Sequence, residues 1–418
     1  MLTLALKSLW NRRSTATLTL ITIAISVLLL TGVDKLRQDA RDGFFNTVSG
    51  TDLIVGARSG SLPLLLYSVF NIGQPTNNIR WSSYQQIIDN DQVAWSIPIT
   101  LGDSHRGFRV VGTTDAYFKH YRFGKNHPLT FSQGDQFDDL FDVVIGAEVA
   151  RALDYDLGDK VVIAHGLGRG SFAMHDDKPF QISGILRPTG TAIDRNLFIS
   201  LEAWEAIHID WRAGTRIPGM NVTADEAREM DLTPNQITAF LLGLESRIST
   251  FHLQRAINNF RAEPLQAILP GVALQELWQV MSIAEKTLLI ISGCVVFAGF
   301  TGMLGMLLTS LNERRRELAV LRAVGASPLR IVVLLMFEAV LLTFLGIILG
   351  LVLLALITFG VQDWLALEYG IFLSSPTWPS QTQWILIGAV QLAGLLTGLI
   401  PAWRAYRYTL ADGLTPRL

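Results

Sequence analysis

The stretch TLLIISGCVVFAGFTGMLGMLLTSLN, residues 287–312, runs for twenty-six residues without a charged side chain. A transmembrane helix needs about 20 predominantly apolar residues, so this stretch is long enough to cross a bilayer. Three further apolar runs lie at residues 14–33, 331–360 and 384–403. The sequence therefore predicts four transmembrane helices, and the segments between them define the other parts of the chain.

The first apolar run, residues 14–33, follows a basic start that contains Lys7, Arg12 and Arg13. Signal peptides have such a start too, but the sequence TGVD at 31–34 lacks their small-residue cleavage site. We therefore expect a retained helix, with a cleaved signal peptide as the alternative. Residues 1–13 place apolar side chains on one helical face, which predicts a cytoplasmic amphipathic helix on the membrane or an extension of the first span.

Lysine and arginine counts predict the orientation, because these residues accumulate in cytoplasmic loops. The first thirteen residues carry three of them, segment 311–330 carries five, the tail 404–418 carries three and the loop 361–383 carries none. We therefore expect both termini and the loop between the second and third helices in the cytoplasm. The region 34–285 and the loop 361–383 are expected on the opposite side of the membrane.

The region 34–285 reads as a soluble domain between the first and second membrane helices. Short β-type segments such as 142–145 and 196–199 alternate with helical ones such as 146–153 and 201–208. This pattern predicts an α+β domain, divided into two subdomains. Its last residues, 275–286, are helical by propensity and would extend the second membrane helix as a stalk.

Composition and motifs argue against catalysis and nucleic-acid binding by this chain. The net charge is −2, and no G-x-x-x-x-G-K-[ST] segment that could cradle a phosphate is present in the 418 residues. We found no convincing nucleophile constellation either. The single cysteine, Cys294, lies inside an apolar run and cannot form an internal disulfide.

The cytoplasmic segment 313–328, ERRRELAVLRAVGASP, has the composition of an amphipathic helix that ends near Gly325 and Pro328. Its arginines could serve only to fix the topology. That role leaves unexplained the apolar side chains of the same segment, which are Leu318, Val320, Leu321 and Val324. A partner protein that docks on this helix would explain both features.

Here the chain resembles a known family. Residues 313–327, followed by an apolar helix with Glu338, Gly346 and Gly350, resemble the FtsX-like permease domain of ABC systems, and PAWRA at 401–405 is similar to the usual ending of that domain. The segments DLIVGA at 52–57 and VIG at 144–146 resemble the periplasmic core domain of macrolide-exporter-type (MacB-type) permeases. The resemblance to this mechanotransmission (type VII) family covers nearly the whole chain.

The resemblance implies a pair of permease subunits, identical or related, resting on a cytoplasmic dimer of ABC ATPases that bind ATP and Mg²⁺. Segment 313–327 would be the coupling helix that the ATPase contacts. The contact residues carried over are Glu313, Arg314, Arg315, Glu317, Leu321, Arg322 and Gly325. Macrolide exporters fuse the ATPase to the permease. Because this sequence shows no such domain, we expect the ATPase on a separate polypeptide, and no cofactor or catalysis in this chain.

The resemblance also implies a multi-pass protein of the bacterial inner membrane that exports or extracts a lipoprotein, peptide or small hydrophobic molecule. A periplasmic adaptor, lipoprotein or substrate-binding protein would be a further partner, beside membrane lipids. Signalling to a periplasmic hydrolase without transport is one alternative, and a zinc-linked role is another. A secondary transporter would need polar residues at the membrane midplane, and only Glu338 and Gln391 stand out there.

Small residues recur at a spacing of four in the apolar runs, and this spacing lets two helix backbones approach closely. The pairs are Ala298 and Gly302, Gly346 and Gly350, and Gly394 and Gly398. We expect helix contacts at these glycines, either within the subunit or between two copies.

A cluster of histidines and carboxylates in the external region is a candidate zinc site. The candidate ligands are His165, His175, Asp176 and Asp177, with His208 and Asp210 further along the chain. Their spacing matches no tight zinc signature, so a solvated hairpin loop is the alternative.

Overall fold

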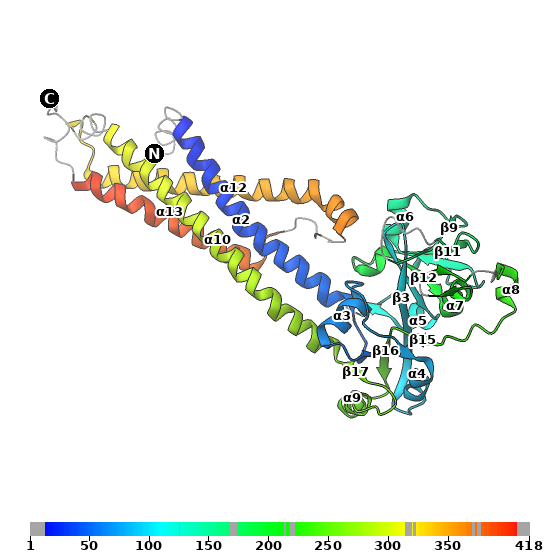
Figure 1. Ribbon diagram of the computed structural model, residues 1–418. Coiled ribbons are helices and arrows are strands. Elements are labelled where there is room, and N and C mark those ends of the chain that lie inside the picture. Colours follow the sequence, from blue (N-terminus) through cyan, green and yellow to red (C-terminus); the bar gives the residue numbers. More distant parts are fainter. Residues whose placement is uncertain are drawn as a thin grey trace. The chain divides into compact units, whose positions relative to one another are not determined.

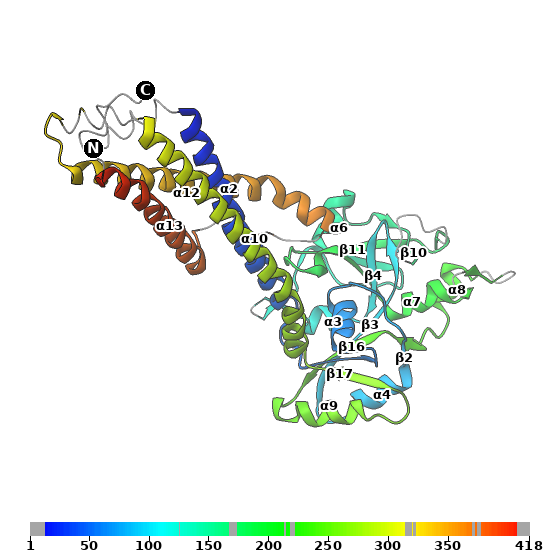
Figure 2. The same ribbon diagram turned by 60° about the vertical axis from the view of Figure 1, so that its left-hand side comes forward.

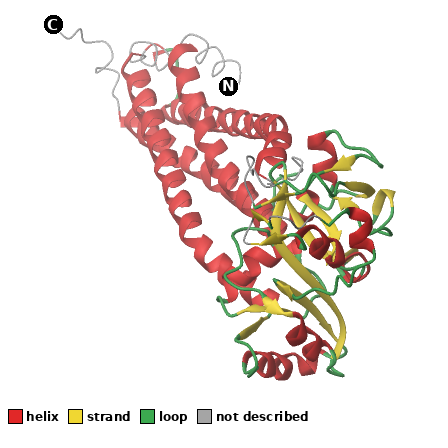
Figure 3. Ribbon diagram, turned by 45° about the vertical axis from the view of Figure 1, so that its right-hand side comes forward, coloured by secondary structure: helices red, strands yellow, loops and turns green. Residues whose placement is uncertain are grey.

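The computed structural model describes residues 13–124, 126–166, 174–212, 215–217, 222–313, 320, 323–369, 373 and 378–407. The chain divides into a helical unit (Met1–Asp39, Met281–Trp364 and Leu373–Leu418) and an α+β unit (Ala40–Val280 and Leu365–Phe372). Figure 3 distinguishes the long helices of the first unit from the strands of the second. The predicted amphipathic helix, the cytoplasmic tail from residue 408, and parts of the 313–328 and 361–383 segments lie outside the described residues.

The helical unit is built on four long helices (Figure 1). They are α2 (Arg13–Thr47), α10 (Pro270–Glu313), α12 (Pro328–Tyr369) and α13 (Gln381–Arg407). Each is long and apolar enough to cross a membrane. The four predicted transmembrane helices, with an α+β domain between the first and the second, are therefore confirmed.

All four helices are longer than the apolar runs that revealed them. The clearest difference is at α12, which continues to Tyr369, whereas the sequence placed a loop from residue 361. The segment VQDWLALEY at 361–369 contains neither glycine nor proline, so nothing in it ends a helix. Hydropathy marks where a helix leaves the bilayer, and the backbone hydrogen bonds continue beyond that point.

Helices α2 and α10 run side by side in both views (Figures 1 and 2). Near the middle, the hydroxyl of Ser26 donates to the carbonyl oxygen of Val295 at 3.3 Å. Further along, Arg37 Nε lies 2.6 Å from Glu285 Oε1. A shared apolar core joins these two helices to α12 and α13, and Glu338 of α12 is 1% exposed, so neighbouring helices cover its side chain.

Four of the predicted packing glycines lie at close helix contacts. A Cβ on Gly346 would collide with Ile23 of α2, and a Cβ on Gly350 would lie 2.7 Å from the carbonyl oxygen of Ala24. On α13, Gly394 faces Thr343 and Gly398 faces Ala339 of α12. These four positions therefore allow α12 to pack closely against α2 and α13.

Gly302 differs from these four in having no close neighbour among the described residues of the subunit. A Cβ on Gly302 would meet no described atom within 4 Å. Helix α10 instead approaches α2 at Gly299, where a Cβ would lie 3.0 Å from Ser26 Oγ. Of the two expected kinds of contact, a contact within the described part of the subunit is therefore not seen at Gly302, and a contact between two copies stays a prediction.

The α+β unit contains one large sheet in the strand order β17–β1–β16–β3–β4–β12–β8–β11–β7, with β10 paired to β3 and β9 paired to β11. The strands of this sheet are β1 (Leu53–Ala57), β3 (Val93–His105), β4 (Phe108–Thr113), β7 (Phe131–Gly134), β8 (Asp142–Ile145), β9 (Lys160–Val161), β10 (Ala164–His165), β11 (Phe180–Leu186), β12 (Asn196–Ser200), β16 (Ala239–Leu244) and β17 (Leu265–Ile268). Short two-stranded pairs join β2 (Ile79–Arg80) to β15 (Gln236–Ile237), β5 (Arg122–Phe123) to β6 (His127–Pro128), and β13 (Trp211–Arg212) to β14 (Thr215–Arg216).

The helices of this unit are short. They are α3 (Ser61–Val69), α4 (Trp81–Ile88), α5 (Ala116–His120), α6 (Ala147–Leu153), α7 (Leu201–His208), α8 (Ala224–Arg228) and α9 (Thr250–Asn258), with 3₁₀ turns η1 (Ala192–Arg195) and η2 (Arg247–Ser249). One apolar core includes residues of α6 and α7, and another includes residues of α4 and α9.

Strand β3 holds the two halves of the sheet together. Its first residues, Val93–Ile99, pair with β16, and its last residues, Thr100–His105, pair with β4. Arg106 and Gly107 make the two-residue turn into β4 and both have positive φ, which suits the twist of a tight hairpin. The end of β3 is thus fixed in register against both β4 and β10.

Replacing Gly350 with alanine should destabilise the helical unit, because the added methyl group would displace α2. Gly302→Ala is the matched control, since both changes raise helix propensity by about 1 kcal/mol and only one of them meets a neighbour. We expect Gly350→Ala to lower the midpoint of thermal unfolding in detergent and Gly302→Ala to leave it unchanged or raise it. Equal midpoints for the two variants would contradict the helix packing described above.

Candidate functional site

Part of the predicted coupling segment lies among the described residues. The amide of Val324 donates to the carbonyl oxygen of Val320 at 3.0 Å, which is a helical turn, and Gly325 follows with φ +99°. The side chains of Val320 and Val324 are 57% and 83% exposed. The described part of the segment therefore presents apolar side chains on a turn that ends at a left-handed glycine.

Two predicted contact residues of this segment have described backbones. Glu313 is the last residue of α10, and Gly325 ends the turn. The other five lie outside the described residues, and they are Arg314, Arg315, Glu317, Leu321 and Arg322. Their role stays a prediction.

The α+β unit brings together a second candidate site, made of Asp103, His165, His175 and His208. Each of the four side chains offers one possible ligand atom, and these atoms all lie within 4.8 Å of one another. The residues come from four separate segments: β3, β10, the segment after β10, and the last turn of α7. We refer to them below as the His₃Asp cluster.

Strand pairing explains how two of the four residues meet. Strand β10 runs antiparallel to β3, and His165 lies directly opposite Asp103 in the register. His165 Nδ1 is 3.1 Å from Asp103 Oδ1, and His208 Nε2 is 3.2 Å from Asp103 Oδ2. His208 Nε2 also lies 3.2 Å from His165 Nδ1. The two imidazole rings therefore face the same carboxylate, one at each oxygen, and also face each other.

The orientation of His208 is fixed from outside the cluster. Its Nδ1 lies 2.7 Å from the backbone carbonyl oxygen of Trp204, one helical turn earlier in α7. A carbonyl oxygen only accepts, so Nδ1 carries the proton in the neutral ring and Nε2 keeps a lone pair that faces the cluster. The same arrangement is common in metal-binding histidines, where it sets both the tautomer and the ring direction.

His175 is the most buried histidine of the cluster. Its exposed fraction is 0%, and neither ring nitrogen has a hydrogen-bond partner among the described residues. Its backbone amide donates to the carbonyl oxygen of Ile163 at 2.9 Å, and its ring packs edge-on against Trp211 with centroids 4.6 Å apart. Leaving a buried polar group unpaired typically costs about 1–3 kcal/mol, so this side chain calls for a partner.

Burial and neighbouring groups together set the pKa values in the cluster, and for Asp103 and His208 they act in opposite directions. Burial lowers the pKa of His175 to about 4, with the charge of His208 acting in the same direction, so the ring is neutral near pH 7. Burial would raise the pKa of Asp103, but the rings of His165 and His208 outweigh it and hold that pKa at about 2. Burial by itself lowers the pKa of His208, and the carboxylate of Asp103 raises it overall. The cluster thus combines a buried carboxylate with imidazole lone pairs.

A buried ion pair holds the two outer segments of the cluster in place. Lys178 Nζ lies 2.9 Å from Asp210 Oδ1, and both side chains are 0% exposed. Lys178 follows His175 by three residues and Asp210 follows His208 by two. The pair therefore connects the segment that carries His175 to the end of α7, with Asp177 Oδ2 3.2 Å from the same ammonium group.

These contacts change the predicted ligand set. His165 and His175 meet as predicted, whereas Asp176 is exposed and outside the cluster, and Asp177 faces Lys178. His208 joins the cluster, but Asp210 faces Lys178 instead. Sequence reasoning missed Asp103, because its approach to His165 depends on the pairing of β3 with β10 and no local spacing reveals it.

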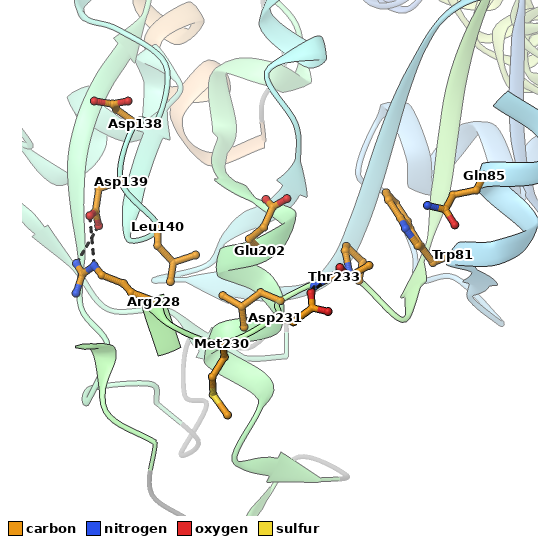
Figure 4. A pocket seen from close by; sticks show the side chains of 12 residues that line it. Trp81, Gln85, Asp138, Asp139, Leu140, Glu202, Arg228, Met230, Asp231 and Thr233 are labelled. Atoms are coloured by element: carbon orange, nitrogen blue, oxygen red, sulfur yellow. Dashed lines mark hydrogen bonds and ion pairs between the residues drawn. The ribbon is translucent and has the colours of Figure 1, made fainter. Parts of the chain in front are cut away.

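Two pockets of the α+β unit lie outside the cluster or at its edge. The first encloses about 330 Å³ and has His165 in its wall, and its other lining residues are Gln74, Pro75, Thr76, Asn77, Asn78, Leu101, Gly102, Arg109 and Gly166. Figure 4 shows the second, of about 600 Å³, in which Arg228 pairs with Asp139 on one side and Trp81 and Gln85 lie on the other. The arginine of this second pocket is already neutralised, so the pocket offers no unpaired cation for a ligand.

Two family profiles match the chain. The MacB-like periplasmic core domain matches residues 16–240, and the FtsX-like permease C-terminal domain matches residues 289–410. The chain therefore belongs to the family of FtsX-like permeases with a MacB-like periplasmic core domain, as the sequence predicted. It is a membrane protein with four transmembrane helices and a periplasmic domain.

Curated relatives carry the name macrolide export ATP-binding/permease protein MacB. The protein of Nitrobacter winogradskyi is 24% identical over 422 residues, which cover 95% of this chain and 57% of the relative. That of Wolinella succinogenes is 23% identical over 321 residues, which cover 75% of this chain and 44% of the relative. The chain thus spans about half the length of the curated relatives it matches.

A solved structure, the periplasmic region of MacB from Actinobacillus actinomycetemcomitans, matches with a TM-score of 0.33 and 11% sequence identity. The match covers 55% of this chain and 94% of that chain.

Removing Lys178 should destabilise the α+β unit strongly, because it takes away the ammonium group that lies 2.9 Å from the buried carboxylate of Asp210. We expect Lys178→Met to cost about 3–5 kcal/mol and the double variant Lys178→Met/Asp210→Leu to recover most of that loss. Tryptophan fluorescence during thermal unfolding measures both effects.

The matched control for this experiment is Arg228→Met. Arg228 and Asp139 are 40% and 53% exposed, so their pair should contribute less than about 1 kcal/mol. A loss from Lys178→Met no larger than that from Arg228→Met would show that the buried pair does not hold the two segments together.

Proposed function

We propose that the chain is the permease subunit of an ABC transporter and that it transmits the nucleotide cycle of an ABC ATPase to its periplasmic domain. The observation that carries this proposal is the length of two unbroken helices. Helix α10 has 44 residues and α2 has 35, which correspond to about 66 Å and 52 Å at about 1.5 Å per residue. The apolar core of a bilayer is only about 30 Å thick.

Both helices pass from the helical unit into the α+β unit, at residues 39–40 and 280–281. A continuous helix carries axial movement and rotation along its whole length, because every turn is hydrogen-bonded to the next. Movement imposed at the cytoplasmic end of α10 would therefore reach the first residues of that helix. This continuity supports mechanical transmission between the two units.

Lateral contacts support the same proposal, because they connect the helices that would move. The Arg37–Glu285 pair joins α2 to α10, and Gln38 Nε2 donates to Ser380 Oγ at 3.0 Å beside the start of α13. These contacts lie outside the long apolar runs. They would make the neighbouring helices move as a group.

The coupling segment 313–328 is the proposed contact with the ATPase, since it is basic and presents exposed apolar side chains at Val320 and Val324. Its basic residues favour a cytoplasmic location for this segment and for both termini. The proposed assembly contains two permease subunits and two ATPase subunits that bind ATP and Mg²⁺. Its proposed cargo is a lipoprotein, peptide or small hydrophobic molecule, extracted or exported on the periplasmic side.

The double variant Leu321→Asp/Arg322→Glu should weaken binding of the ATPase, because it places negative charge within the proposed coupling segment. A pull-down of the co-expressed ATPase from detergent extracts measures this, and we expect at least a tenfold loss. Arg404→Glu, a charge reversal on the last turn of α13, is the control that should retain binding. Full retention of the ATPase by the double variant would refute the assignment of the coupling segment.

Reversing the Arg37–Glu285 pair tests transmission along α2 and α10. We expect Arg37→Glu and Glu285→Arg each to uncouple ATP hydrolysis from movement of the periplasmic domains, and the double swap to restore coupling. Spin-label distances between the two periplasmic domains of the assembly, with and without ATP, report the movement.

A partly exposed pair contributes about 0–1 kcal/mol, so the thermal unfolding midpoint should stay nearly constant in all three variants. Normal ATP-driven distance changes in both single variants would argue against a mechanical role for this contact.

A further inference from the structure

We propose that the α+β unit binds one Zn²⁺ ion through Asp103, His165, His175 and His208. This inference goes beyond the proposed function, because the transmission of movement requires no metal. It depends on the geometry of the His₃Asp cluster and its surroundings, and Asp103 takes the place of the carboxylates that the sequence offered.

The separations within the cluster match those of a tetrahedral zinc site. Zinc–nitrogen and zinc–oxygen bonds are about 2.0–2.1 Å long, so two ligand atoms of a regular tetrahedron lie roughly 3.3–3.4 Å apart. His165 Nδ1 and His208 Nε2 lie 3.2 Å apart, and they lie 3.1 Å from Oδ1 and 3.2 Å from Oδ2 of Asp103, respectively. The possible ligand atom of His175 lies within 4.8 Å of the other three, so a small rotation of its ring would complete the fourth corner.

An ion also resolves an otherwise unfavourable arrangement of polar atoms. Both ring nitrogens of the buried His175 and both oxygens of the buried Asp103 lack a well-directed hydrogen bond among the described residues. The great majority of buried polar atoms in proteins have a hydrogen-bond partner, and those without one call for an explanation. A cation at the centre of the cluster would take one lone pair from each of the four side chains.

The chemical nature of the ligands selects zinc among the common divalent ions. Calcium and magnesium prefer six or more oxygen ligands, and this cluster offers three nitrogens. Imidazole suits zinc, copper and nickel, but Cu²⁺ and Ni²⁺ favour planar or tetragonal arrangements. A set of three imidazoles and one carboxylate, with ligand atoms within 4.8 Å of one another, therefore favours Zn²⁺.

The surroundings of the cluster have the features that support bound metals. The backbone carbonyl of Trp204 orients His208, and the Lys178–Asp210 pair holds the segments of His175 and His208 next to each other. The ring of Trp211 packs against His175 and covers one side. Such supporting contacts typically change metal affinity by about 10–100-fold when they are removed.

The site has a route to solvent, so its ion could exchange. His165 is 35% exposed and forms part of the wall of the 330 Å³ pocket, together with Gly102, Arg109 and Gly166. Because the four ligands come from four segments, a bound ion would cross-link β3, β10, α7 and the segment of His175. Occupancy should therefore stabilise this end of the large sheet, as any ligand that binds only the folded state does.

Zinc titration of the full chain in detergent tests the proposal, with purification by a tag that contains no histidine. Competition against a fluorescent zinc indicator should give one site per chain with a dissociation constant below about 1 µM, and Zn²⁺ should raise the thermal unfolding midpoint. His175→Gln and His208→Gln should each weaken binding by at least about 100-fold and abolish the rise. The matched control is His252→Gln, on the exposed face of α9, which should bind as the parent chain does.

If His175→Gln fails to fold, His165→Gln supplies the same comparison from the exposed side of the cluster. X-ray absorption at the zinc edge should report four nitrogen or oxygen ligands at about 2.0–2.1 Å. Binding only above millimolar Zn²⁺ would overturn the proposal, and so would equal affinity in the cluster variants and in His252→Gln. Neither outcome would affect the ATPase-binding experiment, so the two proposals can fail independently.

Discussion

The absence of water inside a bilayer constrains this structure more than any other single condition. A backbone amide or carbonyl that crosses the apolar core must find its partner within the protein, which only a continuous helix or a closed barrel provides. Four apolar runs satisfy this requirement as helices. Once formed, the helices continue until a residue ends them, so α10 reaches back to Pro270, well before its apolar run begins. The membrane thereby produces long connecting elements that a soluble domain of the same size would rarely contain.

The α+β unit depends on a different constraint, which is the register of β3. This strand pairs with β16 over its first half and with β4 over its second half, so both halves of the large sheet share one backbone. Asp103 lies near the end of the strand, where β10 adds His165 directly opposite. A slip of one residue would turn Asp103 to the other face of the sheet and separate it from the histidines. The same pairing that unites the unit therefore assembles its most unusual group of side chains.

Some features of the molecule could be predicted from the sequence, and others could not. The four membrane helices could be predicted because burial in lipid leaves a long local signal, and helices such as 201–208 could be predicted from their periodicity. The ends of the membrane helices could not, because hydropathy does not report where a helix stops, as α12 shows by continuing to Tyr369. The contact of α10 with α2 at Gly299 was not predicted, since spacing does not reveal which side of a helix faces its neighbour. Asp103 could not be found, because it meets His165 only through long-range strand pairing.

The unbroken course of α10 also restricts how this chain can change in length. Successive residues of an α-helix advance by about 1.5 Å and turn by roughly 100°. One residue inserted between Pro270 and Lys286 would therefore rotate every later side chain of α10 relative to its earlier ones, and the surface that meets α2 would point elsewhere. Insertions of about seven residues, close to two full turns, would nearly preserve that angular phase. Length variation in this part of the molecule should accordingly come in multiples of the helical repeat, whereas surface loops of the α+β unit are free of such a rule.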